Sequence, residues 1–265
     1  MNGTSLSVAA GRPPIPAGAE ALDAVGALRL ALETLGADRV ALSASFGPED
    51  IVLLDLLKAL TPRPRVITLD TGRLPEATHA LMDRVRDRFG IDIEVYAPEA
   101  AALESMVRER GTNLFYRSMD DRFRCCDVRK VEPLRRALAT VDGWVTGLRR
   151  DQAPTRAATP RIGLDLEHGL IWKVAPLVDW TEDRVWAHIR ERDLPYNALH
   201  DQGYPSIGCA PCTRAVAPGD DPRSGRWWWE RPESRECGIH LDHGRSGPAG
   251  GDATPAAEPA AEASA

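Results

Sequence analysis

The sequence predicts an α/β protein in which a parallel twisted sheet carries helices on both faces. Short apolar runs alternate with longer runs of helical periodicity between about residues 21 and 192, and this alternation is typical of strand–helix–strand units. The strand candidates are short and apolar, and several are rich in β-branched residues, as expected for strands buried between two helical layers.

The predicted elements follow one another in a regular order. Pro75 suits the first turn of its helix, and Thr181 is a good N-cap because two acidic residues follow it. After Pro195 the chain is expected to form only loops or short helices. The expected helices are Ala21–Leu35, Ile51–Leu60, Pro75–Phe89, Glu99–Arg110, Val128–Leu138 and Thr181–Arg192. The expected strands are Val40–Ser43, Val66–Leu69, Ile91–Tyr96, Trp144–Thr146 and Leu170–Val174.

Composition narrows the class of protein. The chain has 265 residues, of which 43% are hydrophobic and 27% charged, as in an ordinary globular protein. A formal net charge of −6 argues against a general nucleic-acid binder. No apolar run is long enough to cross a membrane, and no apolar signal segment opens the chain, so we expect a reducing, cytoplasmic location.

Five cysteines form two pairs and a single residue. Cys125 and Cys126 are adjacent, Cys209 and Cys212 form a Cys-x-x-Cys in a loop rich in glycine and proline, and Cys237 stands alone. Four thiolates are enough to hold a metal ion or an iron–sulfur cluster. The fifth is a candidate nucleophile.

Two alternatives to a cluster differ in strength. Disulfides are disfavoured because adjacent cysteines bridge only with strain and an odd number leaves one thiol unpaired. Structural zinc is the stronger rival, since Cys-x-x-Cys often supplies half of a zinc site. Adjacent cysteines are an unusual second half because consecutive side chains diverge unless the backbone bends. The spacing therefore favours an iron–sulfur cluster and leaves zinc open.

Three loops follow predicted strands and are suited to a nucleotide-like anion. They span 43–50, 69–73 and 146–152, and the carboxyl ends of parallel strands meet at the edge where such sheets bind ligands. The first has small residues before a helix but lacks the Gly-Lys-Ser/Thr ending of the common nucleotide loop. Further arginines cluster at 146–156 and 223–235, where guanidinium groups suit phosphate or sulfate.

Taken together, these motifs resemble the assimilatory adenylyl-sulfate (APS) reductases, which are grouped with the PAPS reductases in the adenine-nucleotide α-hydrolase-like (PP-loop type) superfamily. The resemblance runs in order from about residue 25 to about residue 243. It is carried by Ser45-Phe46-Gly47, Leu69-Asp70-Thr71-Gly72, Cys125-Cys126 with Lys130, Gly147-Leu148-Arg149-Arg150-Asp151-Gln152, the Cys209/Cys212 pair and Glu236-Cys237-Gly238-Ile239-His240.

The resemblance implies a reaction. Similar enzymes reduce adenosine 5′-phosphosulfate to sulfite and AMP in sulfate assimilation and cysteine biosynthesis. Their lone cysteine attacks the sulfur, and reduced thioredoxin then releases sulfite from the S-sulfonated cysteine. By this likeness Cys237 is the nucleophile, and Cys125, Cys126, Cys209 and Cys212 hold a [4Fe–4S] cluster.

The same resemblance implies the substrate-binding residues. Lys130 is expected to link cluster and sulfate, and His240 either to orient the nucleophile or to bind substrate. Trp227, Trp228 and Trp229 are expected to pack the C-terminal segment. The expected substrate-binding residues are Ser45, Phe46, Gly47, Leu69, Asp70, Thr71, Gly72, Lys130, Gly147, Arg149, Arg156, Arg223, Arg226 and His240.

We expect four regions along the chain. A reductase domain spans 21–215, and a mobile segment with the catalytic cysteine spans 216–243. The tails 1–20 and 244–265 are expected to be disordered. PAPS reduction, or dual specificity, is the nearest alternative function. A non-redox nucleotide enzyme would need a fuller glycine-rich loop, and a non-catalytic cluster protein would not explain Cys237. A homo-oligomer is left open.

Overall fold

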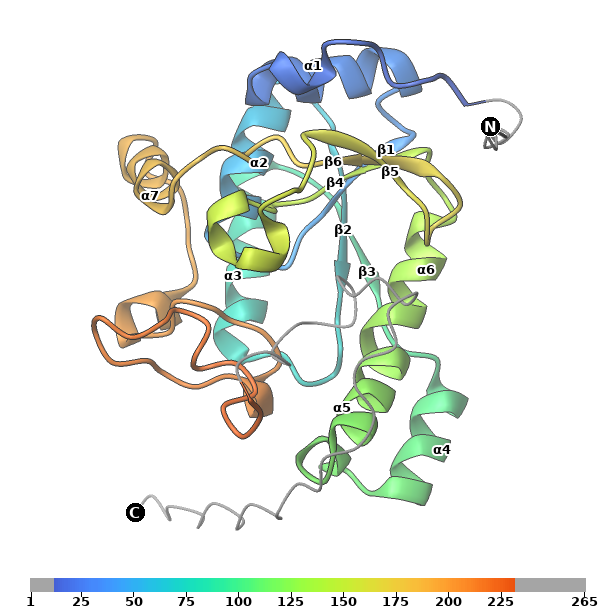
Figure 1. Ribbon diagram of the computed structural model, residues 1–265, viewed down its shortest axis with the longest axis vertical. Coiled ribbons are helices and arrows are strands. Elements are labelled where there is room, and N and C mark those ends of the chain that lie inside the picture. The colour runs from blue at the N-terminus through green and yellow to red at the C-terminus, as the bar shows by residue number, and fades with distance from the viewer. Residues whose placement is uncertain (1–11, 232–265) are drawn as a thin grey trace, which may run out of the picture.

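The computed structural model describes residues 12–231, which form a six-stranded sheet with helices on both faces (Figure 1). The strand order is β3-β2-β1-β4-β6-β5. All neighbouring strands are parallel except β5, which runs antiparallel to β6 at one edge. The strands are β1 (Val40–Ser43), β2 (Arg65–Leu69), β3 (Ile93–Tyr96), β4 (Gly143–Val145), β5 (Ile162–Asp165) and β6 (Ile171–Val174).

Seven α-helices accompany these strands in the described part of the chain. The helix α1 begins after Asp23, whose carboxylate accepts a hydrogen bond from the Gly26 N–H, and α7 begins after the predicted cap Thr181. The helices are α1 (Ala24–Leu35), α2 (Pro48–Leu60), α3 (Glu76–Phe89), α4 (Ala100–Arg110), α5 (Met119–Cys126), α6 (Glu132–Leu138) and α7 (Glu182–Glu191).

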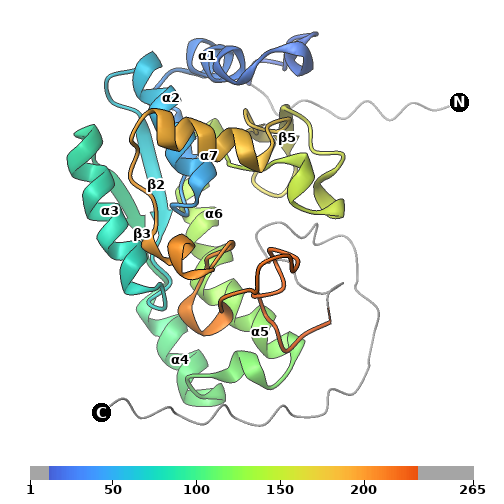
Figure 2. The same cartoon turned by 90° about the vertical axis from the view of Figure 1, so that its left-hand side faces the viewer.

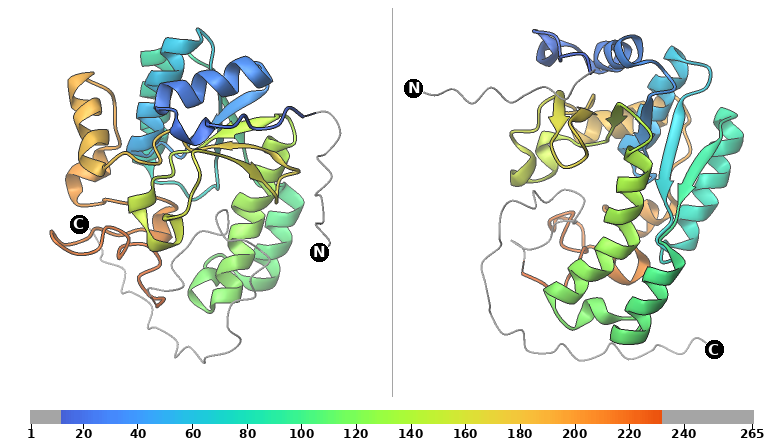
Figure 3. Two further views of the ribbon diagram at one scale, coloured as in Figure 1. Left: turned by 45° about the horizontal axis from the view of Figure 1, so that its top comes forward. Right: turned by 90° about the vertical axis from the view of Figure 1, so that its right-hand side faces the viewer.

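The alternation of side chains along β1 divides the core between two layers. Val40 and Leu42 pack with α1, α2, α3 and α7, whereas Ala41 packs with α6 on the opposite face. Figures 2 and 3 show these helices on the two sides of the sheet. The predicted class, a largely parallel sheet covered on both faces, is confirmed.

Two elements differ from the sequence prediction. The edge strand β5 was not expected, because its Gly163 and its exposed Leu164 weaken the apolar pattern of a buried strand. The expected helix Val128–Leu138 is the last part of a longer helical segment. It begins with α5, passes through a π-helical turn at Asp127–Val131 and continues as α6.

The carboxyl ends of the parallel strands face a region built from distant parts of the chain. In Figure 1, α4, α5 and the segment that follows α7 lie beyond this end of β2. Part of the expected N-terminal tail packs on the sheet, since Trp172 Nε1 donates to the Pro13 carbonyl at 3.1 Å. Among residues 12–231 we find no helix that combines the length and the apolar character required to span a bilayer.

A candidate active site at the carboxyl edge of the sheet

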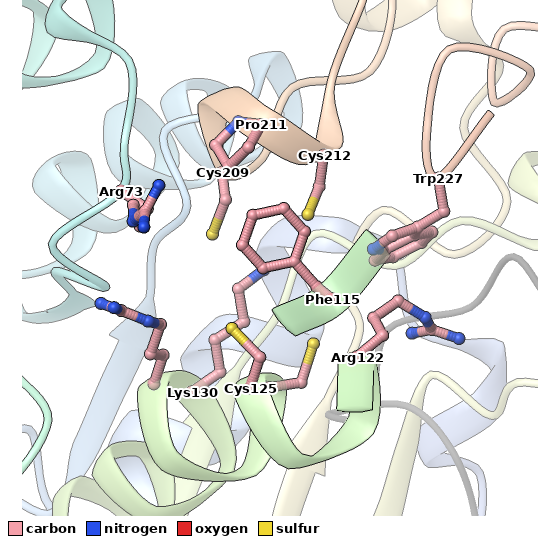
Figure 4. A pocket seen from close by; sticks show the side chains of 11 residues that line it. Arg73, Phe115, Arg122, Cys125, Lys130, Cys209, Pro211, Cys212 and Trp227 are labelled. Atoms are coloured by element: carbon pink, nitrogen blue, oxygen red, sulfur yellow. The ribbon is translucent and has the colours of Figure 1, made fainter. Parts of the chain in front are cut away.

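Four cysteine side chains line a single pocket. Cys125 and Cys126 end α5, while Cys209 and Cys212 flank a short 3-10 helix at Ala210–Cys212. All four are free thiols, each no more than 9% exposed. Figure 4 shows the Cys209 and Cys212 sulfurs directed toward Cys125 on the helix below. The lining residues are Arg73, Phe115, Arg122, Cys125, Cys126, Arg129, Lys130, Cys209, Pro211, Cys212 and Trp227.

The two neighbouring cysteines lie in the last turn of α5, directly before a π-helical turn. Cys126 immediately precedes the turn, whose wider backbone interrupts the regular helix. Such turns are rare and often occur at functional sites. Both cysteines have helical backbone, so the pair lines the pocket from a helix and not from a loop.

The pocket is attached to the loop that follows β2. The Thr71 hydroxyl lies 3.3 Å from the Cys209 sulfur, and the Ala210 N–H donates to the Arg73 carbonyl at 2.8 Å. Asp70 shapes the same loop by accepting a hydrogen bond from the Gly72 N–H at 2.8 Å. The predicted nucleotide loop 69–73 and the predicted cluster cysteines therefore form one continuous site.

Charges around the thiols test whether a metal cluster fits them. Burial raises the pKa of Cys212 to about 12, and the neighbouring Cys209 adds to this effect. Burial also raises the pKa of Cys125, while Arg129 and Lys130 act in the opposite direction. Thiolates at these positions need a strong positive partner, which bound iron provides. The buried, all-sulfur donor set therefore fits an iron–sulfur cluster.

One arginine of the pocket has an unused donor. Arg129 Nη1 donates to the Thr71 carbonyl at 2.5 Å, but its buried Nε has no partner among the described residues. Trp227 Nε1 is also buried and has no hydrogen-bond partner among the described residues. Within residues 12–231, no three His, Cys, Asp or Glu side chains converge closely enough to hold a single metal ion. Cluster ligands differ in this respect, because each cysteine can bind a separate iron.

The loop after β1 is occupied by a side chain of the protein itself. The N–H groups of Ser45 and Gly47 donate to Asp50 Oδ2 at 2.7 and 3.3 Å, and the Ser45 hydroxyl donates to it at 2.9 Å. Phe46 between them is buried with a φ of 61°, a left-handed conformation. The donors predicted to approach an anion thus already hold a carboxylate.

The loop after β4 is fastened to the start of α2. Arg149 Nε donates to Glu49 at 2.9 Å, and its Nη1 donates to Asp151 at 2.5 Å. Gly147 is required here, because a Cβ would lie 2.7 Å from the Glu49 Cβ. Arg149, predicted as an anion clamp, is buried among these carboxylates and fastens the loop to the start of α2.

The remaining predicted cations lie at different depths. Arg156 Nη1 donates to Gln152 at 2.5 Å, so this arginine belongs to the loop after β4. Arg226 is buried beside the short 3-10 helix Ala210–Cys212, where its Nε donates to the Cys212 carbonyl at 3.3 Å. Arg223 is half-buried, and Lys130 lines the cysteine pocket.

The tryptophan run packs against α5 and the turn before it. The fully buried Arg122 donates to Glu230 at 2.6 Å and lies 4.8 Å from the centre of the Trp227 ring. Tyr116 contacts the Trp229 ring edge-on at 4.6 Å. This packing, expected for the tryptophans, brings the segment before residue 232 to the pocket. Cys237 and His240 lie outside the described residues.

Sequence reasoning missed several residues of this pocket. Arg73 and Phe115 line it, as do Arg122 and Arg129. The position of Arg73 directly after Leu69-Asp70-Thr71-Gly72 was the available signal. Nothing local marks Phe115, whereas Arg122 lies one helical turn before Cys125 on α5.

Comparisons with known proteins identify the family of this chain. The model of the phosphoadenosine phosphosulfate reductase domain family matches residues 39–215. Adenosine 5′-phosphosulfate reductase of Allochromatium vinosum is 51% identical over 203 residues, covering 77% of this chain and 79% of that protein. The Burkholderia cepacia protein of the same name is 45% identical, covering 86% of this chain and 90% of its own.

Solved structures give the same answer for the fold. Phosphoadenylyl-sulfate reductase from Candida auris, in a phosphate complex, superposes with a TM-score of 0.64 and 28% identity, covering 78% of this chain and all of that chain. Candida glabrata FMN adenylyltransferase, at 13% identity and a TM-score of 0.52, covers 80% of this chain and 73% of its own and shares only the fold. The chain belongs to the phosphoadenosine phosphosulfate reductase domain family.

Proposed function

We propose that this protein reduces adenosine 5′-phosphosulfate to sulfite and AMP. The names of the Allochromatium and Burkholderia relatives support this substrate. The observation that carries the proposal is the set of four buried thiols in one pocket that joins the loop after β2. An enzyme that binds a nucleotide at the edge of the sheet could thereby hold its sulfate beside that pocket.

The four thiols are the proposed ligands of a [4Fe–4S] cluster. Cys125 and Cys126 would bind from α5, and Cys209 and Cys212 from the turn that packs on Thr71. When bound, the cluster supplies a fixed charge distribution beside the anionic substrate. Lys130 lines the same pocket, so its ammonium is suited to hold the sulfate near the cluster.

Cys237 is the proposed nucleophile. Its thiolate attacks the sulfur of the substrate and forms an S–S bond, while the S–O bond to phosphate breaks and AMP leaves with the electron pair. A reduced dithiol, proposed to be thioredoxin, then attacks the Cys237 sulfur and expels sulfite. Its second thiol closes a disulfide and returns Cys237 as a thiol, so the dithiol supplies both electrons.

Chain geometry supports this assignment. Cys237 follows Arg231 by six positions, which limits their separation to about 20 Å even in a fully extended chain. The tryptophans just before Arg231 lie against the pocket side of α5. Arg156, Arg223 and Lys130 are the proposed partners of the phosphosulfate, because a thiolate approaches an anion only where positive charge offsets repulsion.

The experiment separates substrate and cofactor. Protein purified without oxygen is examined by absorption spectroscopy and then assayed for sulfite with equal concentrations of APS and PAPS, with thioredoxin as reductant. We expect iron–sulfur absorption and faster turnover of APS. Faster turnover of PAPS would assign the protein to the activity named for the Candida auris enzyme, and a colourless zinc protein would refute the cluster.

A further inference from the structure

The carboxylate of Asp50 fills the position where a strand–helix loop ordinarily receives an anion. Two backbone N–H groups and the Ser45 hydroxyl point at its Oδ2. Asp50 is only 6% exposed, so this is a built contact of the interior and not a surface encounter. The loop also begins α2, a helix of 13 residues, whose N-terminal dipole adds to the attraction for negative charge.

A second carboxylate lies beside the first. Glu49 accepts hydrogen bonds from Arg149 Nε at 2.9 Å and from Gln152 Nε2 at 3.0 Å. Glu49 thus has a charged partner in Arg149, whereas Asp50 has only uncharged donors in contact with it. Burial raises the pKa of Asp50 to about 6. Because this value is still below 8, the carboxylate is charged at pH 8.

We propose that Asp50 is a specificity-determining residue that excludes nucleotides with a phosphate chain at the start of α2, such as ATP. A phosphate placed there would meet the Asp50 charge and would find its donors already used. Gly147 lies close to this carboxylate, since an added Cβ there would be 2.9 Å from Asp50 Oδ1.

The inference rests on the proposed function, because it assumes that the phosphosulfate of the substrate points toward the cysteine pocket. Cations concentrate on the β2 side of the site, where Arg73, Arg129 and Lys130 line the cysteine pocket. A nucleotide with one phosphosulfate group can direct its charge there. ATP carries a longer and more strongly charged chain, and the loop after β1 offers it a carboxylate instead of free N–H groups.

The test measures binding rather than turnover. Calorimetry at pH 8 with the cluster-loaded full chain compares ATP and inorganic pyrophosphate on the wild type, on Asp50→Ala and on Asp50→Asn. The matched control is Asp87→Asn, which removes one negative charge from a side chain that is 77% exposed on α3. We expect Asp50→Ala to bind pyrophosphate and ATP at least about tenfold more tightly than the wild type, with no change in the control.

The variants distinguish the possible outcomes. If Asp50→Ala fails to fold, the Asp50→Asn variant provides the test, because it keeps an acceptor oxygen for the loop but loses the charge. We expect Asp50→Asn to bind ATP and pyrophosphate at least about threefold more tightly than the wild type. Unchanged affinity in the folded variant, or an equal gain in Asp87→Asn, would overturn the inference. The calorimetry measures binding and the APS assay measures turnover, so the two results are independent. A negative binding result would overturn the role of Asp50 without bearing on APS reduction, and a negative APS assay would not alter the meaning of the binding result.

Discussion

Replacing Asp50 with asparagine tests whether the buried carboxylate carries an electrostatic cost for the folded protein. Burial raises the pKa of Asp50 from 3.8 to about 6, and the nearby Glu49 adds to the rise, although the Ser45 and Gly47 donors oppose it. The native state therefore binds the proton more tightly than the unfolded state does. The corresponding stability is fully present below pH 3.8 and is lost as the pH rises through about 6.

The size of the effect follows from the two pKa values. At about 1.4 kcal/mol per pH unit, the whole loss amounts to about 3 kcal/mol. About 1.3 kcal/mol of it falls between pH 5 and pH 7. The asparagine side chain would carry no such titration, so the stability of Asp50→Asn relative to the wild type should rise by this amount. In a protein of this size the change corresponds to about 3–5 °C in Tm.

The assay is a pair of thermal scans at several pH values. Cluster-loaded wild type and Asp50→Asn are heated without oxygen at one scan rate, and the difference in Tm is followed from pH 5 to pH 7. Asp87→Asn, altered at an exposed side chain, should show a flat difference. A flat difference for Asp50→Asn as well would refute a raised pKa, and a difference of opposite slope would mean that the loop donors outweigh burial.

Three further predictions concern packing and the thiols. Gly147→Ala should cost about 1–3 kcal/mol in thermal unfolding, because its Cβ would lie 2.7 Å from the Glu49 Cβ; an unchanged Tm would contradict the close packing of this loop. Arg122→Met should cost about 3–5 kcal/mol by breaking the buried ion pair with Glu230. The double variant with Glu230→Gln should recover part of that loss, and additivity would argue against a coupled pair. Cys209→Ser should abolish iron–sulfur absorption while Cys237→Ser retains it, and the reverse pattern would reassign the ligands.

The repeated part of the architecture was predictable from the sequence for a physical reason. Buried parallel strands such as Val40–Ser43 need continuous apolar runs, and the structure has this strand at the same residues. The loops that follow such strands must lie at one edge, so their meeting at the site was also predictable. The edge strand β5 does not need a continuous apolar run, because its Leu164 faces solvent. The periodicity of the sequence therefore did not predict this strand.

The cysteine site was predictable in composition and less so in geometry. Pairing in the sequence indicated that Cys125, Cys126, Cys209 and Cys212 act together, and they line one pocket. The helix that carries the first pair was not anticipated, because charged residues around it obscure the helical pattern.

Arginine roles were the hardest to predict. A guanidinium in a loop looks the same in sequence whether it binds a ligand or a carboxylate of the protein. Arg149 proved to pair with Glu49 and Asp151, and Arg226 to support the Cys212 backbone. The folded arrangement shows which carboxylates and carbonyls these two arginines contact, and it places Lys130 in the lining of the cysteine pocket.

The most direct test of the central claim is the intact mass of the protein after incubation with APS and no reductant. Wild-type protein should gain the mass of one SO₃ group on Cys237, and adding reduced thioredoxin should remove it and release one sulfite. Cys237→Ser should gain nothing while keeping its iron–sulfur absorption. A stable SO₃ adduct on any other cysteine, or sulfite release by Cys237→Ser, would contradict the proposed mechanism.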